Sequence, residues 1–164
     1  MAETVTRDEQ WSMLLSDQVC FALYAASRSL TSLYRPALDE LGLTYPQYLV
    51  LLVLWERGSV PVRALGAALH LDYGTLTPLL KRLEAHGIVR RERSASDERS
   101  VLITLTEQGT ALQARARSVP ALAGNATAME KAELDQLLGL LRKLTANVTA
   151  AGGALAAKSH VDRS

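Results

Sequence analysis

The sequence contains a single cysteine, Cys20, followed by tyrosines at Tyr24, Tyr34 and Tyr45. A cysteine thiolate attacks peroxide oxygens, and phenolic hydroxyls that donate hydrogen bonds to the sulfur favour the thiolate over the thiol. A cysteine with phenols in reach can therefore act as a redox-reactive sulfur. With one cysteine, the chain can form neither an intrachain disulfide nor a cysteine-based metal cluster, so disulfide chemistry requires a small thiol or a second chain.

Within one helix, only Tyr24 of these tyrosines is spaced to contact Cys20. Cys20 and Tyr24 are i, i+4 neighbours and share a helix face. Tyr34 lies fourteen residues after Cys20, about 21 Å along a straight helix at ~1.5 Å per residue, which is beyond hydrogen-bond reach. In an antiparallel helix pair about a two-fold axis, Tyr34 of one subunit can face Cys20 of the other. The alternative interpretation is a small buried cysteine beside Val19 and Phe21, with tyrosines that only pack.

Long helices must position these residues. Apolar residues recur at helical spacing from Gln10 to Leu41, which predicts a first helix that is bent or ended near Pro36 and closed by Gly42. Thr44 and Gln47 match a capping box, and the apolar run that follows predicts a buried second helix.

Residues 61–87 match two short helices joined by a tight turn, which is a helix-turn-helix pattern. Pro61 opens the first helix, Asp72 is the expected N-cap of the second, and Gly87 ends it. Leucines at i, i+3, i+4 and i+7 commit one face of the second helix to the core. The outward face then holds residues that can reach phosphates and base edges in DNA: Tyr73, Thr75, Thr77, Lys81 and Arg82.

A β-hairpin is expected next, because two β-prone runs, 88–93 and 100–105, flank a Ser, Asp and Glu segment. A hairpin directly after a helix-turn-helix is a wing, over residues 88–105. Arg91 lies on it, and Asp97 near its tip can hold Arg99 extended toward a narrow minor groove. The alternative is a solvated hairpin with surface ion pairs.

The C-terminal part predicts two more helices. Thr106 starts the first, which is expected to stop near Pro120, and Thr127 with Glu130 matches a capping box for the second. This last helix carries a leucine seam near the 3.5-residue period, which requires a partner helix. Residues 151–164, with two adjacent glycines, are expected to form a flexible tail.

The segment "VRALGAALHLDYGTLTPLLKRLEAHGIVRRERSASDERSVLITLTEQG" resembles the winged helix-turn-helix core of the MarR family of transcription regulators, including its "RR…D-x-R…LT-x-x-G" ending. The resemblance covers about residues 10–150 and implies a mostly α fold, with one MarR-like domain over residues 1–150. It also implies dimerisation helices at about 10–41 and 106–150. The expected partners are a second copy of the chain, forming a homodimer, and a pseudo-palindromic double-stranded DNA operator.

The segment "DQVCFALYAASRSLTSLYRPALDELGLTYPQYLVLLVLWE" is similar to the organic hydroperoxide resistance regulators within that family. This resemblance implies that Cys20 is the redox-sensing residue, with thiolate hydrogen bonds from Tyr24 in the same subunit and from Tyr34 and Tyr45 across the dimer. It implies a repressor that leaves its operator when an organic hydroperoxide oxidises Cys20 and a low-molecular-weight thiol completes the reaction.

Two other functions remain open from the sequence. A MarR-type repressor can be released by reversible binding of a small aromatic ligand, with Cys20 inert. A thiol peroxidase is less favoured, because the sequence has neither a resolving cysteine nor a basic residue beside Cys20, and we expect the protein not to be an enzyme.

Composition is that of an ordinary globular domain, with 48% hydrophobic and 21% charged residues and a net charge of +1. The sequence has no apolar run of membrane-spanning length and no signal-peptide pattern, which predicts a cytoplasmic protein without a membrane partner. We expect no cofactor and no metal, since His70, His86 and His160 lack ligand spacing.

Overall fold

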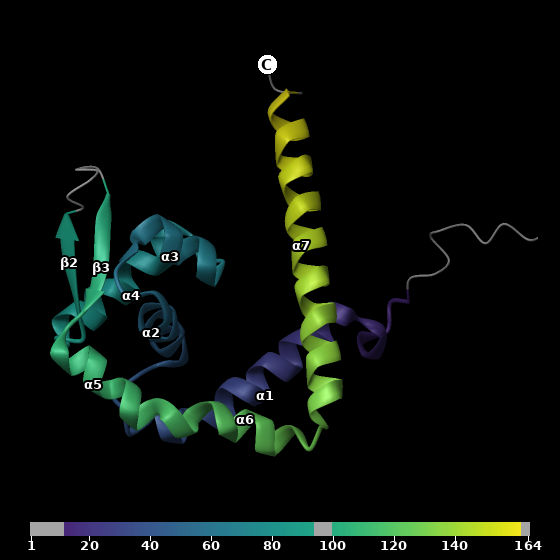
Figure 1. The fold of residues 1–164 in the computed structure, drawn as a ribbon. Helices are drawn as coiled ribbons and strands as arrows, with labels where there is room; N and C mark the ends of the chain where they lie inside the picture. The colour runs from purple at the N-terminus through teal and green to yellow at the C-terminus, as the bar shows by residue number, and fades with distance from the viewer. Residues whose placement is uncertain (1–11, 94–99, 162–164) are drawn as a thin grey trace, which may run out of the picture. The chain divides into compact units, whose positions relative to one another are not determined.

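Helices dominate the chain, and a small antiparallel sheet joins them in the N-terminal two thirds (Figure 1). The computed structural model describes residues 12–93 and 100–161, and their side chains up to residue 152. The chain divides into two compact units, Met1–Ala123 and Gly124–Ser164, each described here by itself. None of the helices in the described ranges has the length and apolar character needed to cross a membrane.

Helix α1, Val19–Asp39, starts later than the sequence predicts. Residues Leu15–Asp17 form a 3-10 turn, and the Gln18 side-chain amide donates to the carbonyl of Ser12 at 2.6 Å. This local contact competes with helix formation, so the prediction of a helix from Gln10 is wrong over the described residues that precede Val19. The helix continues through Pro36, buries Leu38 and ends at Asp39, and Gly42 follows it with φ +68°.

Helix α2, Tyr45–Arg57, occupies the centre of the first unit. Its predicted capping box is confirmed, because Gln47 Oε1 accepts from the backbone N–H of Thr44 at 2.8 Å. Six of its residues are buried: Gln47, Tyr48, Val50, Leu51, Val53 and Leu54. This helix is the element against which α1, α3, α4 and α5 pack.

The helix-turn-helix is confirmed as α3, Val62–Leu69, and α4, Tyr73–Ala85. Asp72 caps α4, with Oδ1 accepting from the backbone N–H of Thr75 at 2.7 Å. The leucines that face inward from α4 are buried at Leu76, Leu80 and Leu83. Gly87 ends the helix with φ +68°, a left-handed conformation that glycine adopts without steric cost.

The wing is confirmed as strands β2, Val89–Arg93, and β3, Val101–Leu105, paired antiparallel with Arg91 opposite Ile103. A third strand, β1, Val60–Pro61, pairs with the other edge of β3. Two residues are too few to show an alternating pattern, so β1 could not be predicted from the sequence.

Helix α5, Glu107–Arg115, begins where predicted, with Thr106 Oγ1 accepting from the backbone N–H of Gly109 at 3.1 Å. The predicted stop near Pro120 is wrong. The helical path instead tightens into a 3-10 turn at Ala116–Ser118 and continues as α6, Val119–Thr127. Proline is tolerated in the first turn of α6, where a backbone N–H has no helical acceptor.

In the second unit, helix α7 spans Lys131–Val161. The capping box predicted from Thr127 is wrong, because that hydroxyl donates to Gly124 O, and Ala128 interrupts the helical path with φ +50°. The cap lies three residues later, where Glu133 Oε2 accepts from the backbone N–H of Glu130 at 2.8 Å.

The backbone of residues 151–161 is helical, where the sequence predicts a flexible tail. Alanine has the highest helix propensity, and the alanines around the two glycines favour continuation of the helix. Along the predicted seam of this helix, Leu137 and Leu138 are 41% and 47% exposed in the single chain.

Candidate functional site

Cys20 is the second residue of α1 and is exposed. Its position in the first helical turn was missed, because the sequence pattern placed the start of the helix at Gln10. The N-cap residue Gln18 makes no side-chain cap. Its amide instead donates to the carbonyls of Ser12 and Leu14. Uncapped N–H groups at a helix N-terminus carry partial positive charge.

Tyr24, one turn after Cys20, is held by a residue that the sequence analysis missed. Arg28 Nη1 donates to the Tyr24 hydroxyl oxygen at 3.2 Å, and its guanidinium carbon lies 5.6 Å from the centroid of the Tyr24 ring. A guanidinium can only donate, so the phenol oxygen is the acceptor and the phenol proton stays available for another group. The i, i+4 spacing of Tyr24 and Arg28 was a readable signal for this pair.

Tyr34 of α1 and Tyr45 of α2 are brought together by the packing of these helices. Their rings stack with centroids 5.3 Å apart and an interplanar angle of 22°. Because Tyr34 and Cys20 belong to one helix, they are about 21 Å apart along its axis at ~1.5 Å per residue. The structure thus pairs the two tyrosines predicted to act across a dimer, and separates Tyr34 from the sulfur of its own chain.

Tyr48, which is 3% exposed, completes this group, with its ring centroid 6.5 Å from those of both Tyr34 and Tyr45. Burial, and secondly the neighbouring phenol of Tyr45, raises the pKa of Tyr34. Burial, then the phenols of Tyr34 and Tyr45, raises the pKa of Tyr48. Both phenols therefore remain protonated hydrogen-bond donors at neutral pH.

The outward face of α4 has the polar character that the sequence predicts. Tyr73 is 72% exposed, and Thr75, Lys81 and Arg82 are exposed, whereas Thr77 is half-buried. The Thr75 hydroxyl donates to Asp72 Oδ2 at 2.9 Å, and the Thr77 hydroxyl donates to the carbonyl of Tyr73 at 2.7 Å. Both hydroxyl oxygens keep acceptor capacity, and the two cations supply donors.

A cavity of about 560 Å³ adjoins this face and is lined by residues of α3, α4 and the wing, including Tyr73, Thr77 and Arg91. Arg63 of α3 also lines it and was missed, because a lone arginine in a short helix gives no pattern. Arg91 Nε lies 3.1 Å from Glu84 Oε2, so this arginine links the wing to α4. Asp97 and Arg99 lie outside the described residues.

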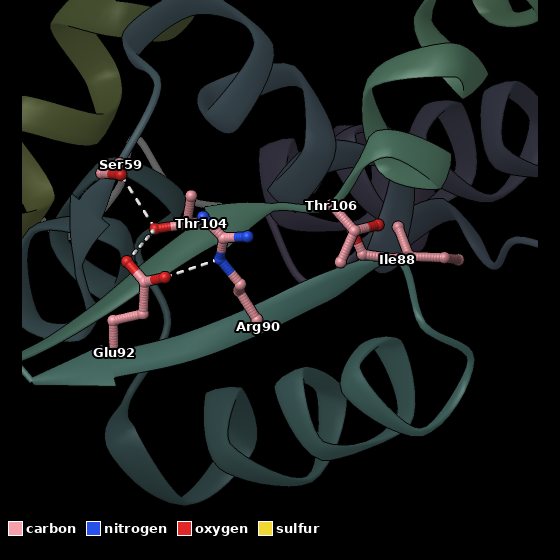
Figure 2. Close-up of polar contacts among 6 residues, drawn as sticks. All are labelled: Ser59, Ile88, Arg90, Glu92, Thr104 and Thr106. Carbon is pink, nitrogen blue, oxygen red and sulfur yellow. Dashed lines mark hydrogen bonds and ion pairs between the residues drawn. The ribbon is translucent and has the colours of Figure 1, made fainter.

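Polar side chains tie the strands of the wing to the loop before β1. Arg90 Nε lies 2.6 Å from Glu92 Oε1, and the Ser59 and Thr104 hydroxyls are 2.8 Å apart. Figure 2 shows Thr104 between Ser59 and Glu92, which accepts from it at 3.5 Å. Arg90 therefore matches the alternative interpretation, because it forms a solvated ion pair with Glu92 on the surface of the wing.

Comparison with known proteins gives one family and closely similar relatives. A family model described as transcriptional regulator SarA/Rot matches residues 32–115. The organic hydroperoxide resistance transcriptional regulator of Bacillus subtilis is 48% identical over 132 residues, which is 80% of this chain and 90% of that protein.

Two solved structures of AbfR, a Staphylococcus epidermidis protein, are also similar. Reduced AbfR bound to DNA is 37% identical, with a TM-score of 0.70 over 86% of this chain and 96% of that chain. Overoxidized AbfR bound to DNA is 40% identical, with a TM-score of 0.63 over 83% of this chain and 98% of that chain.

Proposed function

We propose a function from the premise that the chain belongs to the MarR family of winged-helix transcription regulators. The protein is a dimeric repressor that binds a pseudo-palindromic DNA operator and leaves it when an organic hydroperoxide oxidises Cys20. The observation that carries this proposal is the 48% identity to the Bacillus subtilis organic hydroperoxide resistance regulator over 132 residues, which is 80% of this chain and 90% of that protein.

The DNA-binding part of the proposal rests on α4 and the wing. Lys81 and Arg82 neutralise phosphates or donate to guanine edges, and Thr75 and Thr77 contact neighbouring atoms in the major groove. Tyr73 contacts a phosphate at the helix start. Asp97 and Arg99 are the wing residues that contact the minor groove, whereas Arg91, which pairs with Glu84, holds the wing against α4. Residues 1–150 act as one domain in the dimer, with α1 and the helices after residue 106 at the interface.

The sensing site requires two subunits. Tyr24 donates to Cys20 of its own chain, and the stacked Tyr34 and Tyr45 donate to Cys20 of the partner subunit. The stack supports this arrangement, because it fixes two phenols side by side on α1 and α2. Tyr34 lies too far along α1 to serve the sulfur of its own chain. Three donors and the uncapped helix N-terminus together stabilise the thiolate.

Oxidation proceeds by attack of the Cys20 thiolate on the terminal oxygen of the hydroperoxide. The O–O bond breaks, the sulfur becomes a sulfenic acid, and the leaving alkoxide takes a proton to give the alcohol. A low-molecular-weight thiol then displaces hydroxide from the sulfenic acid, giving a mixed disulfide and water.

The mixed disulfide is the form that releases DNA. Overoxidised AbfR was solved bound to DNA, so addition of oxygen atoms alone did not prevent binding in that relative. A thiol adduct is larger, and it displaces the two phenols of the partner subunit as well as removing the anion that they bind. The resulting shift of α1 against the partner changes the separation of the two recognition helices.

An operator gel shift with reduced protein, cumene hydroperoxide and free cysteine tests this function. The wild type should lose operator binding only when both reactants are present, with a mass increase equal to one cysteinyl adduct per chain. Cys20→Ser should bind the operator equally well with and without both reactants. Release of the Cys20→Ser dimer by peroxide would overturn the proposal, and release of both proteins by a phenolic compound alone would favour the aromatic-ligand repressor.

The same samples separate the repressor from the peroxidase alternative. Steady-state consumption of cumene hydroperoxide with excess thiol should be slow, because the proposed repressor requires the mixed disulfide to persist rather than to be reduced rapidly by a second thiol. Rapid turnover by a protein without operator affinity would instead identify an enzyme.

A further inference from the structure

Trp55 joins the tyrosine group to the helix that follows the wing. Its ring meets that of Tyr48 edge-on, with centroids 6.2 Å apart and an interplanar angle of 64°. Its indole Nε1 donates to the carbonyl of Gly109 in α5 at 3.0 Å. The hydrogen bond spans 54 residues of sequence. An indole that packs edge-on against one ring and donates a hydrogen bond to a distant carbonyl constrains the relative position of α2 and α5.

Gly109 lies at a crowded junction between α5 and the end of α4. A Cβ at this position would lie 2.1 Å from the carbonyl oxygen of Ile88, so the two backbones are in direct contact. The backbone N–H of Gly109 donates to Thr106 Oγ1, and that hydroxyl in turn donates to the carbonyl of Gly87 at 2.6 Å. The backbone N–H of Thr106 also donates to the Ile88 carbonyl at 3.1 Å, and Figure 2 shows these two residues side by side.

A continuous set of contacts therefore runs from the proposed sensing tyrosines to the recognition helix. It passes from Tyr34 and Tyr45 to Tyr48, then through Trp55 to Gly109. From Gly109 it reaches Gly87 and Ile88, where α4 ends and the wing begins. Each step lies within the first compact unit. Packed interiors have low compressibility, so a displacement of the first rings is transmitted rather than absorbed.

We propose that Trp55 is a positioning residue that transmits the oxidation state of Cys20 to the α4 and wing junction through its bond to Gly109. The proposal rests on the function above. When the tyrosine pair loses its contact with the partner's sulfur, the Tyr48 ring reorients against Trp55. The Nε1 hydrogen bond, which is directional, carries that change to Gly109 and hence to the angle between α4 and the wing.

The test compares Trp55→Phe with wild type, and uses Glu56→Gln as a matched control on the same helix. Phenylalanine keeps an aromatic ring beside Tyr48 and removes only the donor. Glu56 is exposed and has no part in the contact set. Operator Kd is measured for each protein in the reduced form and as the isolated Cys20 mixed disulfide, with the adduct verified by intact mass.

Trp55→Phe should leave the reduced Kd nearly unchanged and lower the ratio of oxidised to reduced Kd by roughly fivefold, the scale of one hydrogen bond. Glu56→Gln should keep the wild-type ratio. An unchanged ratio in Trp55→Phe overturns the positioning role, and so does an equal loss of affinity in both forms. Neither result bears on Cys20 as sensor. In this experiment the sensor assignment fails if the wild-type mixed disulfide binds the operator as tightly as the reduced protein.

A measurement on the wild-type chain keeps the proposal testable if Trp55→Phe does not fold. The side-chain Nε1–H resonance of Trp55, assigned in protein labelled with ¹⁵N-tryptophan, reports its hydrogen bond directly. It should shift between the reduced protein and the mixed disulfide. An identical resonance position in the two forms overturns the proposal.

Discussion

The rings of Tyr34 and Tyr45 stack at a centroid distance of 5.3 Å, which joins α1 to the first turn of α2. Aromatic stacking fixes both rings while leaving each hydroxyl at the ring edge. The pair thus behaves as one rigid unit with two donors, and its hydroxyls can be removed without removing the rings.

Tyr45→Phe should keep the stack and the fold but lose one donor to the partner's Cys20. A hydrogen bond to a charged group contributes about 1.5–3 kcal/mol, so the second-order rate constant for oxidation by cumene hydroperoxide should fall roughly tenfold or more at pH 7. Stopped-flow loss of free thiol measures the rate, and operator affinity of the reduced protein serves as the control. A wild-type rate in this variant would show that Tyr45 does not donate to the sulfur.

Arg28→Gln should slow oxidation of Cys20 by cumene hydroperoxide at pH 7. The guanidinium keeps the Tyr24 oxygen as an acceptor, which leaves the phenol proton free to be donated to the sulfur. Arg28→Lys should be intermediate, because it retains charge without the planar donor geometry. Arg35→Gln, an exposed arginine on the same helix, should match wild type; equal effects of Arg28→Gln and Arg35→Gln would contradict a specific contact.

Stability should fall at high pH in a way that depends on Tyr34 and Tyr48. Their pKa values are raised by burial and by the adjacent phenols, so the folded state favours protonated rings. Ionisation of the unfolded chain begins near the ordinary value of 10.0, so this contribution is complete below that pH and is lost as pH rises through the folded pKa. Urea unfolding from pH 8 to 11 should show a shallower decline for Tyr48→Phe than for wild type, whereas parallel curves would rule out this origin.

Lys81→Ala should weaken operator binding and reduce the salt dependence of the binding constant. Loss of one phosphate contact lowers the slope of log K against log salt by about 0.9. Fluorescence anisotropy from 50 to 300 mM salt gives both quantities. Lys131→Ala, which removes a cation paired with Asp135 in the second unit, should leave the slope unchanged. A wild-type slope for Lys81→Ala would place Lys81 away from the DNA backbone.

Local signals in the sequence were sufficient for the winged helix-turn-helix. Asp72 and Gly87 act through atoms only a few residues away, and the inward leucines follow the helical repeat, so each could be identified without tertiary information. The start of α1 could not, because the apolar spacing continues upstream while the Gln18 amide turns back to the carbonyl of Ser12.

Contacts between segments far apart in the sequence could not be predicted from local sequence patterns. Nothing in the sequence pairs Glu84 with Arg91, or Trp55 with the carbonyl of Gly109, because these partners depend on how strands and helices pack. The residues proposed for the sulfur site come from the resemblance and stay a prediction. The surroundings of Cys20 could not be predicted, since neither the helical N-terminus at Cys20 nor the guanidinium of Arg28 follows from the resemblance.

The exposed position of Cys20 in a chain with no second cysteine gives the proposed switch an unusual kinetic character. Both its triggering and its resetting become bimolecular events with diffusible reagents. After an oxidant pulse, the operator then stays unoccupied until a cellular thiol reduces the mixed disulfide. The duration of gene expression therefore depends on the concentration of reducing thiol in the cell.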